Sequence, residues 1–252
     1  MKIMMVGSSW SVGSWAKSSE QNIDTCIDTG IAGLLGKYHN VDNYSQRDSF
    51  NYGCEEQAAL NGYQNYDLIL ACQNDVFKDL AYDSDPTGWR KIKTFDTTRP
   101  VSAEAFIRDG VEDLEDLRVW LLSRFYRTMA SYGKPVMVYA GAGLVDSSLA
   151  TKYGVHPVQP DWCKLLVPEY KSSYVESNHY LGWATELMLD LVPGNRQRIQ
   201  EQCLAFADEI NARLELYRSN PDLFAYHHPT VLGNRGMGEY LLHTIEKQYG
   251  QL

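Results

Sequence analysis

Three short apolar runs, each followed by small or polar residues, stand out along the chain. They extend from Ile3 to Val6, from Tyr66 to Cys72 and from Pro135 to Ala140. Their apolar positions are nearly continuous and do not alternate with polar ones, which is typical of strands covered on both faces. We therefore predict three buried strands of a parallel sheet.

Apolar residues spaced three and four apart lie between and after these runs. One such pattern, from Leu114 to Met129, stops before Gly133, a good helix-ending residue. Others run from Ile199 to Tyr217 and, more briefly, over about 27–35 and 55–62. Strands that alternate with helices predict an α/β fold, with a central parallel sheet and helices on both faces.

A chain of 252 residues is long enough to bury a large core, and we predict one domain spanning 1–252. The stretch 146–193 is rich in proline and aromatic residues and has weak periodicity. We interpret this stretch as an ordered insertion or a lid over the sheet edge, with a packing appendage as the alternative.

Charge and cysteine usage narrow the function classes. A formal net charge of −9 argues against a nucleic-acid partner, because nucleic-acid binders carry a basic surface. The five cysteines are scattered without a CxxC pair, and no HExxH motif occurs, so we expect reduced thiols and no metal. The chain also lacks a Walker loop and a GxGxxG motif, and no cofactor is predicted.

The sequence contains no apolar stretch long enough to span a membrane and no signal-peptide pattern at its start. We therefore predict no membrane partner. The expected location is cytoplasmic or within a larger assembled particle.

The residues that follow the predicted strands would share one edge of the sheet, where ligands bind in such folds. The stretch after the first strand, GSSWSVG, fits two hypotheses: a phosphate cradle, or the seat of a nucleophile at Ser9. A nucleophilic serine needs a base and oxyanion donors. Asn74 offers an amide donor at a second strand end, and His228 lies just before a final helical pattern.

Three motifs in this order resemble the SGNH (GDSL-type) hydrolases: Gly7-Ser8-Ser9, Gln73-Asn74-Asp75 and His228-Pro229-x-x-x-Gly233. The resemblance extends over nearly the whole chain and implies a flavodoxin-like three-layer α/β/α sandwich. It also implies that Ser9 is the nucleophile, that its own N–H and the Asn74 amide hold the oxyanion, and that His228 is the general base.

The chain departs from the pattern of that family in three places. Ser8 replaces an aspartate of the first motif, and Ala225 stands where the third member of the triad belongs. Asp222 or a backbone carbonyl could orient His228 instead, and some members of that family work as serine–histidine dyads. The glycine that donates to the oxyanion from the second block is also missing, and the candidate replacements are Ser45, Arg47 and Asp48.

Each motif alone has a simpler explanation. Gly7-Ser8-Ser9 could be a capped strand-to-helix turn, Asn74-Asp75 a cap and turn, and His227-His228 a surface turn. We interpret His156-Pro157 as a loop, because no glycine follows at the family's spacing. Only the joint occurrence of the motifs in family order favours catalysis.

The main hypothesis is a serine hydrolase that cleaves a carboxylic ester. An O-acetyl group on a carbohydrate is the suggested substrate, on family habit and on the neighbouring Trp10 and Trp15. The alternative is a catalytically degenerate module that serves as a binding or structural component of a homo-oligomer or a larger assembly. Modules that resemble this family occur in bacterial surface-polysaccharide loci and in bacteriophage particles.

Overall fold

The computed structural model describes residues 1–16, 23–25, 30–46, 49–80, 109–141, 143–171, 173–175, 177–225 and 228–250, with the backbone alone at 14–16 and 23–25. Its centre is a parallel sheet of five strands: β1 (Lys2–Val6), β4 (Asn40–Asn43), β5 (Leu68–Gln73), β6 (Val136–Ala140) and β7 (His156–Pro157). Their spatial order is β4-β1-β5-β6-β7. Counted along the chain this is 2-1-3-4-5, the flavodoxin-like order, and the predicted α/β fold is confirmed.

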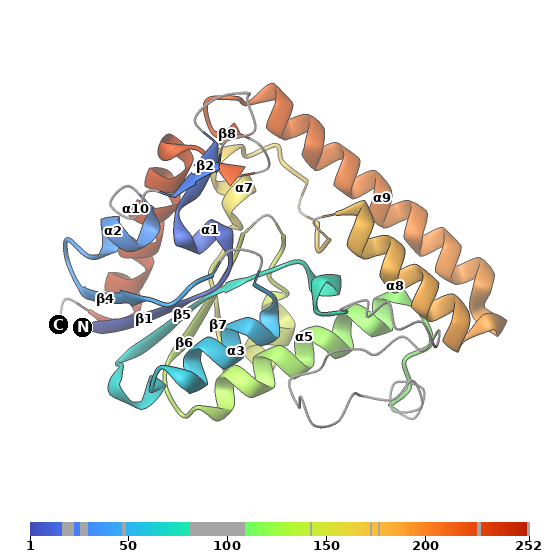
Figure 1. Ribbon diagram of the computed structural model, residues 1–252, viewed down its shortest axis with the longest axis horizontal. Coiled ribbons are helices and arrows are strands. Elements are labelled where there is room, and N and C mark those ends of the chain that lie inside the picture. Colours follow the sequence, from blue (N-terminus) through green and yellow to red (C-terminus); the bar gives the residue numbers. More distant parts are fainter. Residues whose placement is uncertain are drawn as a thin grey trace.

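Helices cover both faces of this sheet (Figure 1). One face carries α1 (Ser9–Val12), α2 (Ile31–Leu35) and α10 (Val231–Tyr249), and the other carries α3 (Asn51–Leu60) and α5 (Leu114–Ser131). Side chains of β1 alternate between the two cores: Met4 and Val6 pack with α3 and α5, while Ile3 and Met5 pack with α2 and α10. Since β1, β5 and β6 are covered on both faces, their sequences are almost continuously apolar.

Two predicted helices are close to their observed bounds. The pattern from Leu114 to Met129 is α5, whose first turn is capped by the Asp113 carboxylate accepting from two backbone N–H groups. The pattern from Ile199 to Tyr217 is the core of α9 (Arg196–Ser219). The helix predicted over 27–35 is described only as α2, since 27–29 lie outside the described residues.

Helix α3 begins at Asn51, four residues before the predicted start at 55. Its first N–H groups are capped by a residue distant in the sequence: the Asp79 carboxylate accepts from Asn51 N at 2.7 Å and from Tyr52 N at 3.3 Å. The local sequence therefore carries no capping signal, and periodicity alone placed the start too late.

The stretch 146–193 contains α6 (Ser147–Lys152), β7, α7 (Trp162–Leu166) and α8 (Asn178–Leu191). It therefore supplies the edge strand of the central sheet. The interpretation of His156-Pro157 as a loop was wrong, because these two residues are β7, paired in parallel with β6. Proline is tolerated there because an edge strand has neighbours on one side only.

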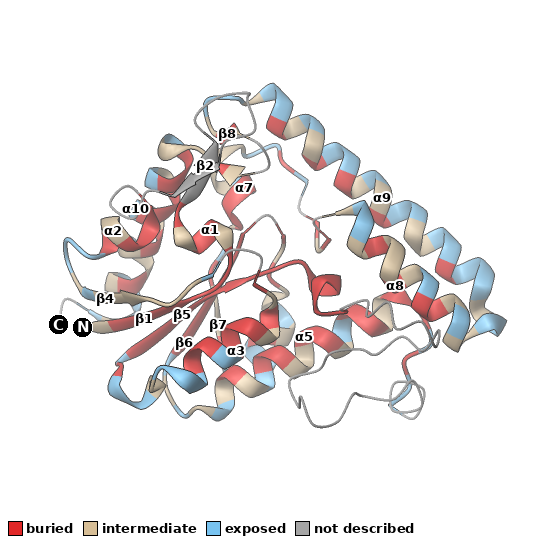
Figure 2. Cartoon of the chain, in the orientation of Figure 1, coloured by how far each residue is buried: buried red, intermediate tan, exposed pale blue. Residues whose placement is uncertain are grey.

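The remaining described elements are short, apart from α9, which packs alongside α8 (Figure 1). They are two antiparallel pairs, β2 (Ser14–Ala16) with β3 (Ile23–Thr25) and β8 (Phe224–Ala225) with β9 (His228–Pro229), and three 3₁₀ turns, η1 (Tyr63–Asn65), η2 (Val76–Asp79) and η3 (Pro193–Asn195). Figure 2 shows the central strands buried and the outward face of α9 exposed.

Four cysteines fall within the described residues and all are free thiols, as expected. Cys54, Cys72 and Cys163 are buried, and Cys203 is half-buried. Cys26 lies outside the described residues. No helix in the described ranges has the length and apolar character needed to cross a membrane.

Candidate active site

The structure brings together Ser9 and His228, which are 219 residues apart in the sequence. The Nε2 atom of His228 lies 2.8 Å from the Ser9 hydroxyl oxygen, which is hydrogen-bond distance. Both residues are half-buried, so the pair is shielded but reachable. With a proton on Nδ1 of the imidazole, Nε2 can accept the serine proton, which is the arrangement that activates a nucleophile.

The turn that positions Ser9 requires the Gly7 backbone to pack closely against Ser11 and Cys72. A Cβ atom on Gly7 would lie 2.2 Å from the Ser11 hydroxyl oxygen and 2.6 Å from Cys72 Cβ, so only glycine fits. The turn is held from inside by the Ser11 hydroxyl, which donates to the Ser8 carbonyl at 2.9 Å. Ser9 is the first residue of α1, so its N–H has no partner within the helix.

His228 is held by the hairpin of β8 and β9, which joins directly to α10. Thr230 caps α10, its hydroxyl oxygen accepting from Gly233 N at 3.3 Å. Asn234, fully buried, donates its side-chain amide to the Pro229 and Thr230 carbonyls. A Cβ atom on Gly233 would lie 2.6 Å from the Leu223 carbonyl oxygen, which explains why glycine stands five residues after the histidine.

Trp10 forms a wall beside His228. The two rings are stacked at 6.1 Å between centroids and tilted by 30°. Trp10 is 3% exposed and is fixed by an edge contact with Trp162 at 4.9 Å. A Cβ atom on Gly141 would lie 2.9 Å from Trp10 Cγ, so the end of β6 leaves room for this indole.

Asn74 follows β5 at the same edge of the sheet and is buried. Its backbone N–H donates to the Asn51 side chain at 2.8 Å, and its side-chain nitrogen lies 3.9 Å from Cys54 Sγ, a long contact. The next residue, Asp75, accepts from Phe77 N and from Ser177 N, which ties this turn to the start of α8. Topology thus places Asn74 near Ser9, and its role as an oxyanion donor stays a prediction.

The second-block candidates lie in the loop after β4. Ser45 donates its N–H to the Asn43 side chain at 3.1 Å, and its hydroxyl is buried without a hydrogen-bond partner in the described structure. Arg47 and Asp48 lie outside the described residues. The missing glycine donor therefore stays unassigned among these three.

Among the described residues, no hydrogen bond joins the carboxylate of Asp222, the predicted orienting acid, to the His228 imidazole. Asp222 is exposed, and its backbone carbonyl accepts from the Thr230 hydroxyl at 2.5 Å. Among the described residues, the Asp222 carboxylate forms no hydrogen bond or ion pair. Ala225 pairs directly with His228 across the hairpin of β8 and β9.

One residue of the site gave no sequence signal. Gln57 of α3, 5% exposed, brackets the Gly7 backbone: its side-chain oxygen accepts from Gly7 N at 2.9 Å, and its nitrogen donates to Gly7 O at 3.3 Å. A polar residue on a helix has no pattern that marks such a contact. The nucleophile turn is therefore fixed by α3 as well as by the strand.

Within the described ranges, no group of three or more histidine, cysteine or acidic side chains is arranged to hold a metal ion. A pocket of about 310 Å³ lies beside α3, next to the Gly7 turn. Two buried carboxyl groups are Glu55 of α3 and Asp79 of η2, and burial raises the pKa of Glu55 to about 8 and that of Asp79 to about 6.

No protein-family model matches the chain. A segment of 131 residues is 28% identical to a plasmid recombination enzyme type 1 from Staphylococcus aureus. That match covers 49% of this chain and 32% of the enzyme, so the chain spans about a third of the length of this curated relative.

Solved structures of two esterases resemble the chain over almost its full length. The aryl esterase of M. smegmatis aligns with a TM-score of 0.42 and 13% identity over 98% of both chains. A variant of an acetyl-xylooligosaccharide esterase from Geobacillus aligns with a TM-score of 0.39 and 13% identity, over 97% of this chain and 93% of that one. Structural similarity at this level carries no argument about activity.

Proposed function

We propose that this protein is a serine hydrolase of the SGNH type that cleaves carboxylic esters. The observation that carries the proposal is the 2.8 Å contact between Ser9 Oγ and His228 Nε2. A phosphate cradle at the same turn would need no histidine on the serine hydroxyl, so this pairing favours the nucleophile hypothesis.

In the proposed reaction, Ser9 Oγ attacks the ester carbonyl carbon while its proton passes to His228 Nε2. The tetrahedral intermediate then collapses: the carbon–oxygen bond to the alcohol breaks, and Nε2 gives the proton to that alcohol. Water attacks the acyl-enzyme in a second cycle, giving its proton to Nε2 and restoring the Ser9 hydroxyl as the acid leaves.

The negative charge on the carbonyl oxygen needs donors fixed in advance. The first donor in the proposal is the Ser9 N–H, which has no partner within α1. The second is the Asn74 side-chain amide at the adjacent strand end, which would turn from Cys54 Sγ toward the substrate. The proposed ester is an O-acetyl group on a carbohydrate.

The second candidate is a module that keeps the fold without catalysis and serves as a binding or structural part of a larger assembly. The observation that favours it is Ala225, which puts a methyl group opposite His228. The two candidates differ in whether Ser9 reacts.

The deciding experiment combines a small ester with a covalent probe. The purified protein is expected to hydrolyse p-nitrophenyl acetate and to be labelled by a fluorophosphonate at Ser9. The Ser9→Ala and His228→Ala variants are expected to lose turnover, and Ser9→Ala to lose labelling. Ser131→Ala, an exposed serine at the end of α5, is the control that retains labelling. Equal hydrolysis by wild type and Ser9→Ala would remove Ser9 from the mechanism.

A further inference from the structure

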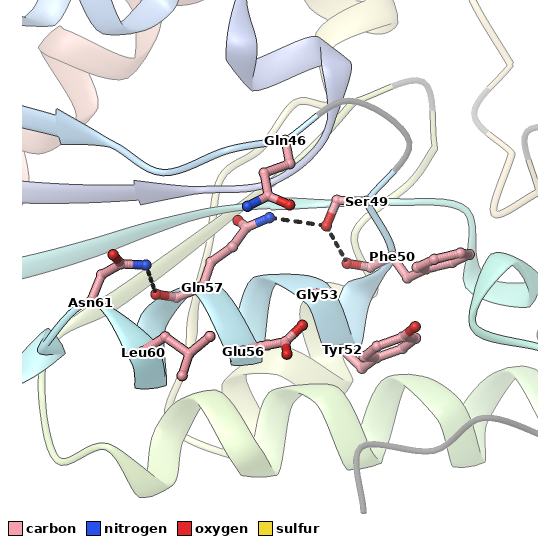
Figure 3. A pocket seen from close by; sticks show the side chains of 9 residues that line it. All are labelled: Gln46, Ser49, Phe50, Tyr52, Gly53, Glu56, Gln57, Leu60 and Asn61. Carbon is pink, nitrogen blue, oxygen red and sulfur yellow. Dashed lines mark hydrogen bonds between the residues drawn. The ribbon is translucent and has the colours of Figure 1, made fainter. Parts of the chain in front are cut away.

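A pocket of about 310 Å³ lies between α3 and the loop that follows β4 (Figure 3). This volume is at the lower end of the range for small-molecule sites. Its lining consists of Gln46, Ser49, Phe50, Tyr52, Gly53, Glu56, Gln57, Leu60 and Asn61. The proposed reaction uses none of these side chains.

The inner wall of the pocket is polar and closely built. Ser49 and Gln57 are 8% and 5% exposed, and the Gln57 amide donates to the Ser49 hydroxyl at 3.0 Å. A Cβ atom on Gly53 would lie 2.2 Å from that hydroxyl, so glycine lets the loop approach α3. This wall is made by specific close contacts and is not a chance gap between surface side chains.

The described rim offers hydrogen-bonding groups and one carboxylate. Gln46, Glu56 and Asn61 contribute two amides and one carboxylate, and all three residues are exposed. Among the described residues, the one charged side chain that lines the pocket is the Glu56 carboxylate. A phosphate or an acidic sugar would meet this negative charge, in a chain with a net charge of −9.

One end of the pocket is aromatic. The rings of Phe50 and Tyr52 are stacked at 5.2 Å and nearly parallel, with 7° between their planes (Figure 3). Behind Phe50, Lys78 Nζ lies 5.6 Å from the Phe50 ring and 5.8 Å from the Tyr180 ring of α8. Tyr180 in turn contacts Trp183 at 5.6 Å. A series of contacts thus leads from Phe50 through Lys78 to Tyr180 and Trp183 of α8.

We propose that this pocket, beside the Gly7 turn, binds one ring of a neutral oligosaccharide. Amide and carboxylate groups match sugar hydroxyls, which both donate and accept hydrogen bonds, and the aromatic end matches the apolar face of a sugar ring. The Glu56 carboxylate on the rim favours neutral sugars over nucleotides.

The pocket is connected to the candidate nucleophile through Gly7. Gln46 N donates to the Gly7 carbonyl at 3.0 Å, and Gln57 brackets the same residue. Gly7 is two residues before Ser9, so their Cα atoms are at most about 7 Å apart. The inference rests on the proposed function in one respect: the sugar held here belongs to the ester that Ser9 cleaves.

Binding is tested in the Ser9→Ala background, which cannot turn over substrate. Xylotetraose and cellotetraose are titrated by calorimetry, with tetragalacturonate as the acidic probe. We expect at least one neutral tetrasaccharide to bind, tetragalacturonate not to bind, and Tyr52→Ala to weaken binding by about tenfold or more. Glu56→Ala, at an exposed position that does not threaten folding, is expected to weaken it by about threefold or more.

Tyr38→Ala is the matched control, because Tyr38 is 64% exposed and does not line the pocket. Circular dichroism establishes that each variant is folded. The inference is overturned if neither neutral sugar binds at concentrations up to about 10 mM, or if Tyr52→Ala and Glu56→Ala both bind like Tyr38→Ala.

Turnover separates this inference from the proposed function. On acetylated xylotetraose, Tyr52→Ala is expected to raise KM, while its hydrolysis of p-nitrophenyl acetate is unchanged. Neutral-sugar binding without hydrolysis of either ester would support the pocket and reject the esterase. Hydrolysis of p-nitrophenyl acetate without sugar binding would support the esterase and reject the pocket.

Discussion

Ala225 lies directly opposite His228 across the hairpin of β8 and β9. Residues opposite each other in an antiparallel pair project from the same face, with Cβ atoms about 5 Å apart. A carboxylate at position 225 would therefore lie within reach of the imidazole. The methyl group that stands there cannot accept a hydrogen bond from Nδ1.

This relationship predicts a gain of activity on Ala225→Asp. A carboxylate that orients the ring and stabilises the imidazolium should raise kcat on p-nitrophenyl acetate by about tenfold or more, which corresponds to roughly 1.4 kcal/mol of barrier. Ala225→Asn, of similar size and without charge, is the matched control. If the aspartate variant is no faster than the asparagine variant, the proposed contact with His228 is wrong.

Asp222 gives a prediction of the opposite kind. Its side chain is exposed, and its structural contact is made by the backbone carbonyl, which any residue supplies. Asp222→Ala is therefore expected to change kcat by less than about twofold. Steady-state kinetics against Glu215→Ala, an exposed acid on α9, would check this. A tenfold loss in Asp222→Ala alone would assign the orienting role to Asp222.

Trp10 is expected to act as a positioning residue, because its ring stacks beside His228. Trp10→Phe keeps an aromatic wall and should retain most of kcat. Trp10→Leu removes the wall, so we expect a fall in kcat of about tenfold or more with little change in KM. Equal kcat values in the two variants would reduce Trp10 to a packing role.

Much of this architecture could be predicted from the sequence. Continuous apolar runs marked β1, β5 and β6, because strands buried on both faces carry no polar positions. The motif order indicated Ser9 and His228, which the fold brings within hydrogen-bond distance. Such a pairing is predictable because it depends on a few residue types at fixed places in a common topology.

The rest depended on contacts that the sequence does not mark. The start of α3 is fixed by Asp79, 28 residues after Asn51, so no local cap indicated it. The bracket of Gln57 on Gly7 joins residues 50 apart through one buried amide. Strand β7 has only two residues and includes a proline, too short for any periodicity to appear.

Two glycine-to-alanine substitutions are expected to have opposite effects on stability. Gly7→Ala would place a methyl group against Ser11 and Cys72, and we expect a loss of about 1–3 kcal/mol. Gly182 lies within α8 with open space around its Cα, so Gly182→Ala should gain about 0.5–1 kcal/mol from helix propensity. Urea unfolding measures both. A neutral Gly7→Ala would show that the turn before Ser9 relaxes freely.

The pH dependence of stability should report on Glu55, which is 1% exposed. Burial is the main cause that raises its pKa from 4.5 to about 8, although the nearby Arg124, 3.3 Å away, opposes the shift. The folded protein therefore holds a proton at this site that the unfolded chain has lost. The contribution of Glu55 to stability is fully present below pH 4.5 and declines as pH rises toward 8.

Glu55→Gln removes that titration while keeping a side chain of the same shape. The free energy of unfolding of the wild type should fall between about pH 5 and pH 8, with a slope of at most about 1.4 kcal/mol per pH unit from this group. The variant should fall less over pH 6 to 8, and the slope that remains at lower pH includes Asp79, whose pKa is raised to about 6 by burial, and Glu209, whose pKa burial also raises. Glu56→Gln, the exposed neighbour, is expected to follow the wild type. Parallel curves for wild type and Glu55→Gln would show that Glu55 is ionised in the folded protein across this range.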